Sequence, residues 1–205
     1  DDCFNGIPAG CDVNKIEADH SESRKWQKNA IRLYDDILMN YPQYQRADEV
    51  LFYLGSAYQE IKEPDKAVKH FIRLTKEYSE SEYIPGAFVQ IGEYYFDRNN
   101  AYKALNAYKQ AAKYKNFSNY GFAVYKLSWC YYNVGEYDNA IEGMKTVVRY
   151  SETQKASGDK KALTLQDEAL KDLVRFFADA GDMQEAEDYF RGLGKEELYN
   201  KMLKR

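Results

Sequence analysis

The chain has 205 residues, of which 44% are hydrophobic and 30% are charged, an ordinary composition for one large soluble domain or a short array of repeats. Its formal net charge of −4 argues against a nucleic-acid partner, because phosphate contacts require a basic surface. No apolar run is long enough to cross a bilayer, so direct membrane insertion is not expected. The 20 tyrosines suit interfaces between closely packed helices, where a ring packs and its hydroxyl still reaches water.

Residues 1–20 are expected to form an irregular N-terminal segment, because glycines and a proline interrupt it and no apolar period appears. Cys3 and Cys11 lie in this segment and either form a disulfide, which would imply an oxidising compartment, or remain free thiols. The chain begins with Asp-Asp, without a recognisable signal peptide, and its last residues have a helical pattern that stops early. We therefore expect a processed form or a piece of a longer protein.

The sequence predicts no metal site and no cofactor. Its two histidines, His20 and His70, are far apart, and neither has a second ligand at the spacing of a metal site. With so few histidines, a His-activated nucleophile is not expected. The many carboxylates are typical of solvated helix faces, so we expect no enzymatic activity.

A first helix is expected over residues 21–42, ending at Tyr41-Pro42 because proline disfavours a helical conformation in the residue before it. No helical pattern precedes it. We therefore interpret it as a half repeat, the second helix of a hairpin whose first helix is absent or degenerate. Its apolar side carries Trp26, Ala30, Leu33, Tyr34 and Ile37.

Four helical hairpins are expected to follow this helix, each with two apolar stripes that must be buried against a neighbour. In the third hairpin, for example, Val124 and Leu127 precede a turn at Gly135, and Ala140 and Met144 follow it. The expected bounds are 48–81, 85–116, 121–151 and 167–194, with the start of a further helix over 196–205.

Residues 152–166 interrupt the regular spacing of these hairpins. The segment is mostly polar and contains Ser157, Gly158 and Asp159. Because insertions between repeats usually map to loops, we expect an exposed, mobile insertion here. An early start of the next helix, at about Lys160, is the alternative.

The hairpins resemble tetratricopeptide repeats, in which Leu-Gly, Tyr, Ala and Phe recur in this order over about 34 residues. The matching residues are Leu54-Gly55, Tyr58, Ala67 and Phe71; Ile91-Gly92, Tyr95, Ala104 and Tyr108; Leu127-Ser128, Tyr131, Ala140 and Met144; and Leu173-Val174, Phe177, Ala186 and Phe190. The resemblance implies an all-α fold, a right-handed α-α superhelix of tetratricopeptide (TPR) hairpins. It also implies a non-enzymatic scaffold that binds a partner protein or peptide.

The segment from Tyr41-Pro42 to Ala47-Asp48 resembles the joint between repeats of bacterial envelope proteins. These include BamD-like assembly lipoproteins, YbgF-like periplasmic proteins and repeat proteins of gliding motility. The resemblance implies a periplasmic scaffold in an envelope complex, with a cytoplasmic location as the alternative. A different functional class also stays open, namely a helical regulatory or docking module of a larger enzyme or assembly.

In tetratricopeptide repeats the first helix of each hairpin lines the concave face, so the resemblance implies a groove formed by residues between the motif positions. The expected groove residues are Phe52, Val89, Glu93, Phe96, Asp97, Phe122, Tyr125, Trp129 and Tyr132. The last four form one helical stripe. They are either an exposed patch for an apolar or weakly basic partner segment, or they are packed beneath 152–166 or the last helix. The oligomeric state stays open.

Overall fold

The computed structural model describes residues 21–155 and 160–204, and within them all regular secondary structure is helical. The N-terminal segment 1–20, with Cys3 and Cys11, lies outside the described residues. The helices in chain order are α1 (Ser21–Asn40), α2 (Ala47–Glu60), α3 (Pro64–Glu77), α4 (Ile84–Phe96), α5 (Ala101–Ala111), α6 (Tyr120–Asn133), α7 (Tyr137–Lys155), α8 (Lys160–Ala180), α9 (Met183–Gly192) and α10 (Glu196–Leu203).

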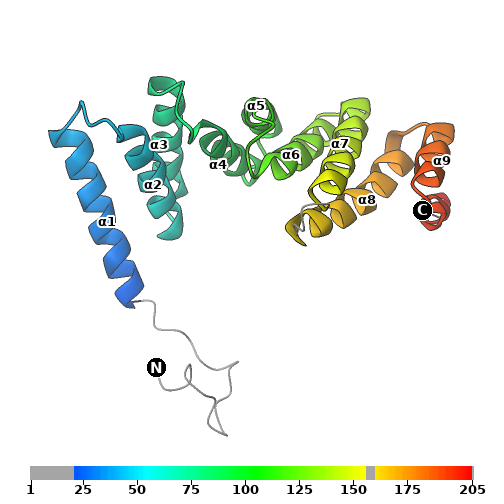
Figure 1. The fold of residues 1–205 in the computed structure, drawn as a ribbon, viewed down its shortest axis with the longest axis horizontal. Helices are drawn as coiled ribbons and strands as arrows, with labels where there is room; N and C mark the ends of the chain where they lie inside the picture. Colours follow the sequence, from blue (N-terminus) through cyan, green and yellow to red (C-terminus); the bar gives the residue numbers. More distant parts are fainter. Residues whose placement is uncertain (1–20, 156–159, 205) are drawn as a thin grey trace, which may run out of the picture.

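The helices pair into consecutive hairpins, α2 with α3, α4 with α5, α6 with α7 and α8 with α9, which stack in one direction along an elongated array (Figure 1). Helix α1 packs on α2 at one end, and α10 packs on α8 and α9 at the other. The predicted all-α superhelix of helical hairpins is therefore confirmed. Within the described residues, no helix combines the length and apolar character that crossing a membrane requires.

The repeat motif sets how closely the two helices of a hairpin approach. A Cβ atom built on Gly92 of α4 would lie 2.6 Å from the ring of Tyr108 on α5. That ring is completely buried. A residue without a side chain on the first helix thus lets an aromatic ring on the second helix lie directly against the backbone.

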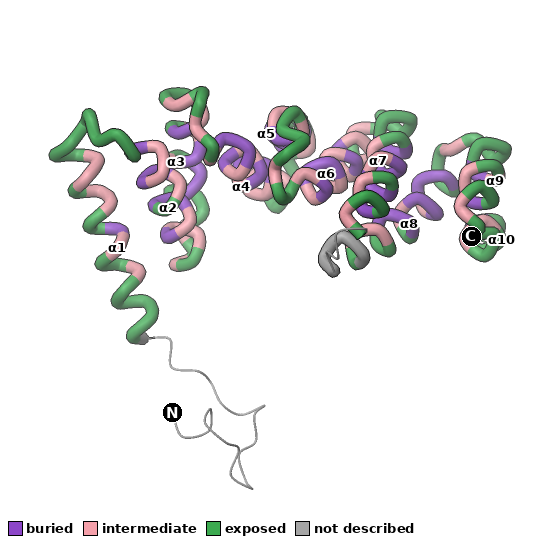
Figure 2. Tube along the Cα trace, viewed as in Figure 1, coloured by how far each residue is buried: buried purple, intermediate pink, exposed green. Residues whose placement is uncertain are grey.

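Buried side chains form separate clusters along the array, each shared by neighbouring hairpins. Figure 2 shows the buried positions distributed along the stacked hairpins from α2 to α9. One cluster, for example, joins Leu51 of α2, Phe71 of α3 and Ile91 of α4. Because each hairpin contacts only its neighbours, the free energy of unfolding is close to a sum of local contributions.

The prediction of a loop over 152–166 was wrong for most of this segment. Helix α7 continues to Lys155 and α8 begins at Lys160, so only residues 156–159 lie outside the described part of this segment. The early start at Lys160 is thus the alternative that agrees with the structure. The two helices are longer because packing continues there: Ser151 is completely buried, and Leu165 packs against the core of the last hairpins. Of the polar residues described in the segment, Glu152, Thr153, Lys155 and Thr164 are exposed.

Candidate partner-binding site

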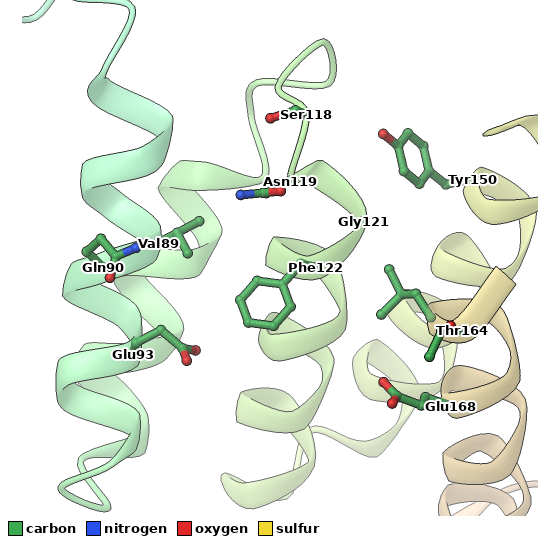
Figure 3. A pocket seen from close by; sticks show the side chains of 11 residues that line it. Val89, Gln90, Glu93, Ser118, Asn119, Gly121, Phe122, Tyr150, Thr164 and Glu168 are labelled. Atoms are coloured by element: carbon green, nitrogen blue, oxygen red, sulfur yellow. The ribbon is translucent and has the colours of Figure 1, made fainter. Parts of the chain in front are cut away.

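A pocket of about 600 Å³ lies between the first helices of three successive hairpins, α4, α6 and α8 (Figure 3). Three expected groove residues meet in it: Val89 and Glu93 come from α4, and Phe122 comes from α6. The remaining lining residues are Gln90, Ser118, Asn119, Gly121, Tyr150, Thr164, Leu165 and Glu168. A concave site of this size is typical of ligand-binding pockets in proteins.

The carboxylate of Glu93 on one wall of the pocket is held by two neighbours. It accepts a hydrogen bond from the hydroxyl of Tyr108 and forms an ion pair with Lys126, whose Nζ lies 3.0 Å from Oε1. Burial raises the pKa of Tyr108, and the hydrogen bond to Glu93 raises it further, so the phenol stays protonated and donates. The Nζ of Lys126 also lies 4.7 Å from the ring centroid of Phe96. Glu93 is therefore a fixed and largely compensated negative charge.

Glu168 of α8 provides the second carboxylate, on the opposite wall. Figure 3 shows the Glu93 and Glu168 side chains pointing toward one another from α4 and α8, with the ring of Phe122 between them. Glu168 is exposed, and no ion pair among the side chains of residues 22–155 and 164–204 involves it. The pocket thus combines apolar side chains with a carboxylate that no cation compensates among the side chains that the structure describes, those of 22–155 and 164–204.

The aromatic stripe on α6 does not form a free groove. The Tyr125 hydroxyl donates to Asp172 of α8 at 2.7 Å, and the Trp129 indole N–H donates to the same carboxylate at 3.0 Å. Burial raises the pKa of Tyr125, and so does its hydrogen bond to Asp172. Both rings belong to the contact between α6 and α8. They are therefore packed, but against Asp172 and Phe176 rather than beneath 152–166 or the last helix.

The ring of Tyr132 continues this contact. It stacks on Phe176 of α8 with 4.4 Å between the ring centroids, and Trp129 meets the same ring edge-on at 5.0 Å. The Arg175 guanidinium lies 5.3 Å from the ring centroids of both Trp129 and Tyr132. The half-buried stripe therefore joins two hairpins, and only Phe122 of the four aromatic residues lines the pocket.

The other expected groove residues lie elsewhere along the array. Phe52 packs against Phe71 and Tyr83, with ring centroids 5.7 and 5.2 Å away, and so belongs to the contact between the first two hairpins. Phe96 lies beside Lys126 near the pocket, and Asp97 is exposed directly after α4. None of the three lines the pocket.

Sequence reasoning missed the wall formed by Tyr150, Leu165 and Glu168. Leu165 lies within 152–166, where a loop was expected, and Tyr150 comes from a second helix, which was not considered for the groove. A signal was present, since Leu165, Ala169 and Phe176 occur at helical spacing and continue the apolar stripe of α8.

Comparison with known proteins supports the repeat assignment. Residues 49–81 and 122–151 match the family model described as tetratricopeptide repeat, which corresponds to the α2–α3 and α6–α7 hairpins. No curated protein matches the chain.

Solved structures share the fold over nearly the whole chain. A crystal structure of MamA is 20% identical, with a TM-score of 0.56 over 92% of this chain and 93% of that one. A structure of nearly identical TPR-like repeats, assigned to a kinesin light chain of Podosopora anserina, is 15% identical, with a TM-score of 0.57 over 91% and 95%. At these identities the likeness shows the fold alone. Two segments of the chain therefore match the tetratricopeptide-repeat model, and the chain shares the fold of these TPR-like structures.

Proposed function

We propose that this chain is a non-enzymatic scaffold that binds a segment of a partner protein in the pocket between α4, α6 and α8. The observation that carries the proposal is the pocket itself, which opens on the first helices of three successive hairpins and collects Val89, Glu93 and Phe122. An elongated array of hairpins presents such a surface on a preformed backbone, so little conformational entropy is lost on binding.

The chemistry of the pocket favours a weakly basic segment with at least one apolar side chain. The apolar side chain would contact Phe122 and Leu165, and a Lys or Arg beside it would lie near Glu168. The amide of Asn119 and the hydroxyl of Thr164, both on exposed residues of the rim, can bond to the main chain of the segment. A C-terminal carboxylate would meet Glu93 and Glu168 instead, so we do not expect an acidic terminus to bind.

We further propose that the partner belongs to a bacterial envelope complex and that binding takes place in the periplasm. The support is the resemblance of the Tyr41-Pro42 joint to repeats of envelope proteins. Fractionating cells that express the native gene, with detection by antibody, tests the location. Recovery with the cytoplasmic fraction would contradict it.

Site-specific photocrosslinking tests the pocket. A benzophenone amino acid at Thr164, on the rim, should trap a partner from envelope extract, whereas the same group at Thr153, an exposed position of α7 outside the pocket, should not. Glu168→Lys should weaken capture of the same partner, because the new lysine would repel the Lys or Arg of the partner that Glu168 attracts. Glu197→Lys, on exposed α10, is the matched control. Equal crosslinking from both threonines, or capture unaffected by Glu168→Lys, would overturn the proposal.

A further inference from the structure

Helix α1 carries an apolar stripe that faces away from the rest of the array. Trp26, Ala30, Leu33 and Ile37 occur at spacings of four, three and four residues, which place them on one side of the helix. Trp26 is 69% exposed and Leu33 is 58% exposed. The side of α1 that packs on α2 is a different one, formed by Ile31, Tyr34 and Leu38.

The repeat explains two residues of this stripe, Ala30 and Ile37. When α1 is aligned with α3 through Tyr41 and Tyr78, which follow the two helices, Ala30 corresponds to Ala67 and Ile37 corresponds to Leu74. Ala67 and Leu74 are 1% and 0% exposed, in a cluster that α3 shares with α2 and α4. The stripe of α1 thus lies where the first helix of its own hairpin would pack. No helix of residues 21–155 and 160–204 lies there, and α1 stands at the end of the array (Figure 1).

We propose that the α1 helix of a second copy of this chain covers the stripe, antiparallel and across a two-fold axis. A two-fold contact needs a self-complementary surface, because each residue pair occurs twice. An antiparallel crossing midway between Ala30 and Leu33 provides one. It pairs Trp26 with Ile37 of the second copy, and the small Ala30 with Leu33 of the second copy, so that large and small side chains alternate.

The charges beside the stripe favour the same arrangement. Basic residues concentrate in the first part of α1, while Asp35 and Asp36 lie in the second part. Lys25 and Asp36 flank the stripe on one side; both are exposed, and no ion pair in the described part of the chain involves them. An antiparallel pair of α1 helices brings Lys25 of each copy beside Asp36 of the other, whereas a parallel pair would align the basic first parts of the two helices with each other.

The oligomeric state of the full chain tests this proposal independently of the pocket. Sedimentation velocity over a wide range of concentrations should show a reversible monomer–dimer equilibrium. Leu33→Glu should shift it to monomer, because it buries two carboxylates in the apolar contact. Leu203→Glu is the matched control, since Leu203 is 52% exposed and its helix α10 packs at the opposite end of the array from α1 (Figure 2). A chain that is monomeric at all concentrations, or a dimer unaffected by Leu33→Glu, would overturn the proposal.

A charge exchange separates the antiparallel pair from other dimers. Lys25→Glu alone, and Asp36→Lys alone, should each raise the dimer dissociation constant by roughly 3- to 10-fold, because each places like charges together twice. The double variant should restore the original value, and mixing the two single variants should give heterodimers. If the double variant is as weak as the single ones, Lys25 and Asp36 do not meet and the antiparallel arrangement is wrong.

Discussion

The ring of Phe71 on α3 occupies the space that a side chain on Gly55 of α2 would need. A Cβ atom built on Gly55 would lie 2.7 Å from two atoms of this ring, closer than real Cβ contacts. Phe71 is completely buried and has no room to move away without disturbing its neighbours. The pair therefore fixes the distance between the two helices of this hairpin.

Gly55→Ala should lower the free energy of unfolding by roughly 1–3 kcal/mol, as expected for overpacking of a tight core. Urea unfolding followed by circular dichroism measures the change. The control is Gly192→Ala, at the end of α9, where no atom lies within 4 Å of the added Cβ. Its effect should lie between zero and a stabilisation of roughly 1 kcal/mol, because alanine restricts the unfolded chain. Equal effects of the two variants would show that the Phe71 contact is not tight.

The third hairpin should tolerate an exchange of its small residues. Here the glycine has moved to the second helix, and a Cβ atom on Gly143 would overlap the hydroxyl of Ser128 and lie 3.1 Å from its Cβ. Gly143→Ala should destabilise the chain by roughly 1–3 kcal/mol. In a Ser128→Gly background the same substitution should be much less damaging, since the clashing atoms are gone. A double-mutant cycle by urea unfolding measures this coupling, and simple additivity would contradict it.

Removing Trp129 should destabilise the array rather than leave its melting temperature unchanged. The indole donates a hydrogen bond to Asp172 and packs on Phe176, so Trp129→Ala removes one of the two contacts that each α8 group makes with α6. Because the ring is half-buried, we expect a loss of roughly 1–3 kcal/mol. Tyr102→Ala, at a tyrosine that is 71% exposed, should change the stability very little. Similar melting temperatures for the two variants would mean that the Trp129 ring is a free surface.

Stability should fall in alkaline solution, in part through Cys130. Burial raises the pKa of this thiol to about 12, whereas an unfolded chain ionises it at about 8.5. The buried Cys130 thiol therefore contributes fully to the free energy of unfolding below about pH 8.5. This contribution is lost as the pH rises toward about 12, because the unfolded chain releases the thiol proton first.

Urea unfolding at several pH values between 7 and 10 measures the effect. The decline should be less steep in Cys130→Ala than in the unchanged chain, and part of it should persist, since burial also raises the pKa of Tyr108. Identical slopes for the two proteins would show that Cys130 does not titrate differently on unfolding.

The sequence by itself determined the hairpins. The spacing of residues such as Leu54, Gly55 and Phe71 is a local pattern with the period of an α-helix, and a small residue opposite a ring specifies how two adjacent helices meet. These contacts lie within about 20 residues of each other along the chain. The fold, and the part of the pocket formed by Val89, Glu93 and Phe122, could therefore be predicted.

Only the tertiary structure decided which faces remain open. Whether Trp129 meets a partner or α8 depends on how one hairpin is rotated against the next, and no local period encodes that rotation. The lengths of α7 and α8 were likewise decided by packing, because Ser151 is buried and Leu165 is partly buried by contacts that the polar composition of 152–166 conceals. The exposed stripe of α1 has the same origin: Ala30 and Ile37 follow the repeat pattern, but only the stacking of the described helices leaves Trp26 and Leu33 uncovered.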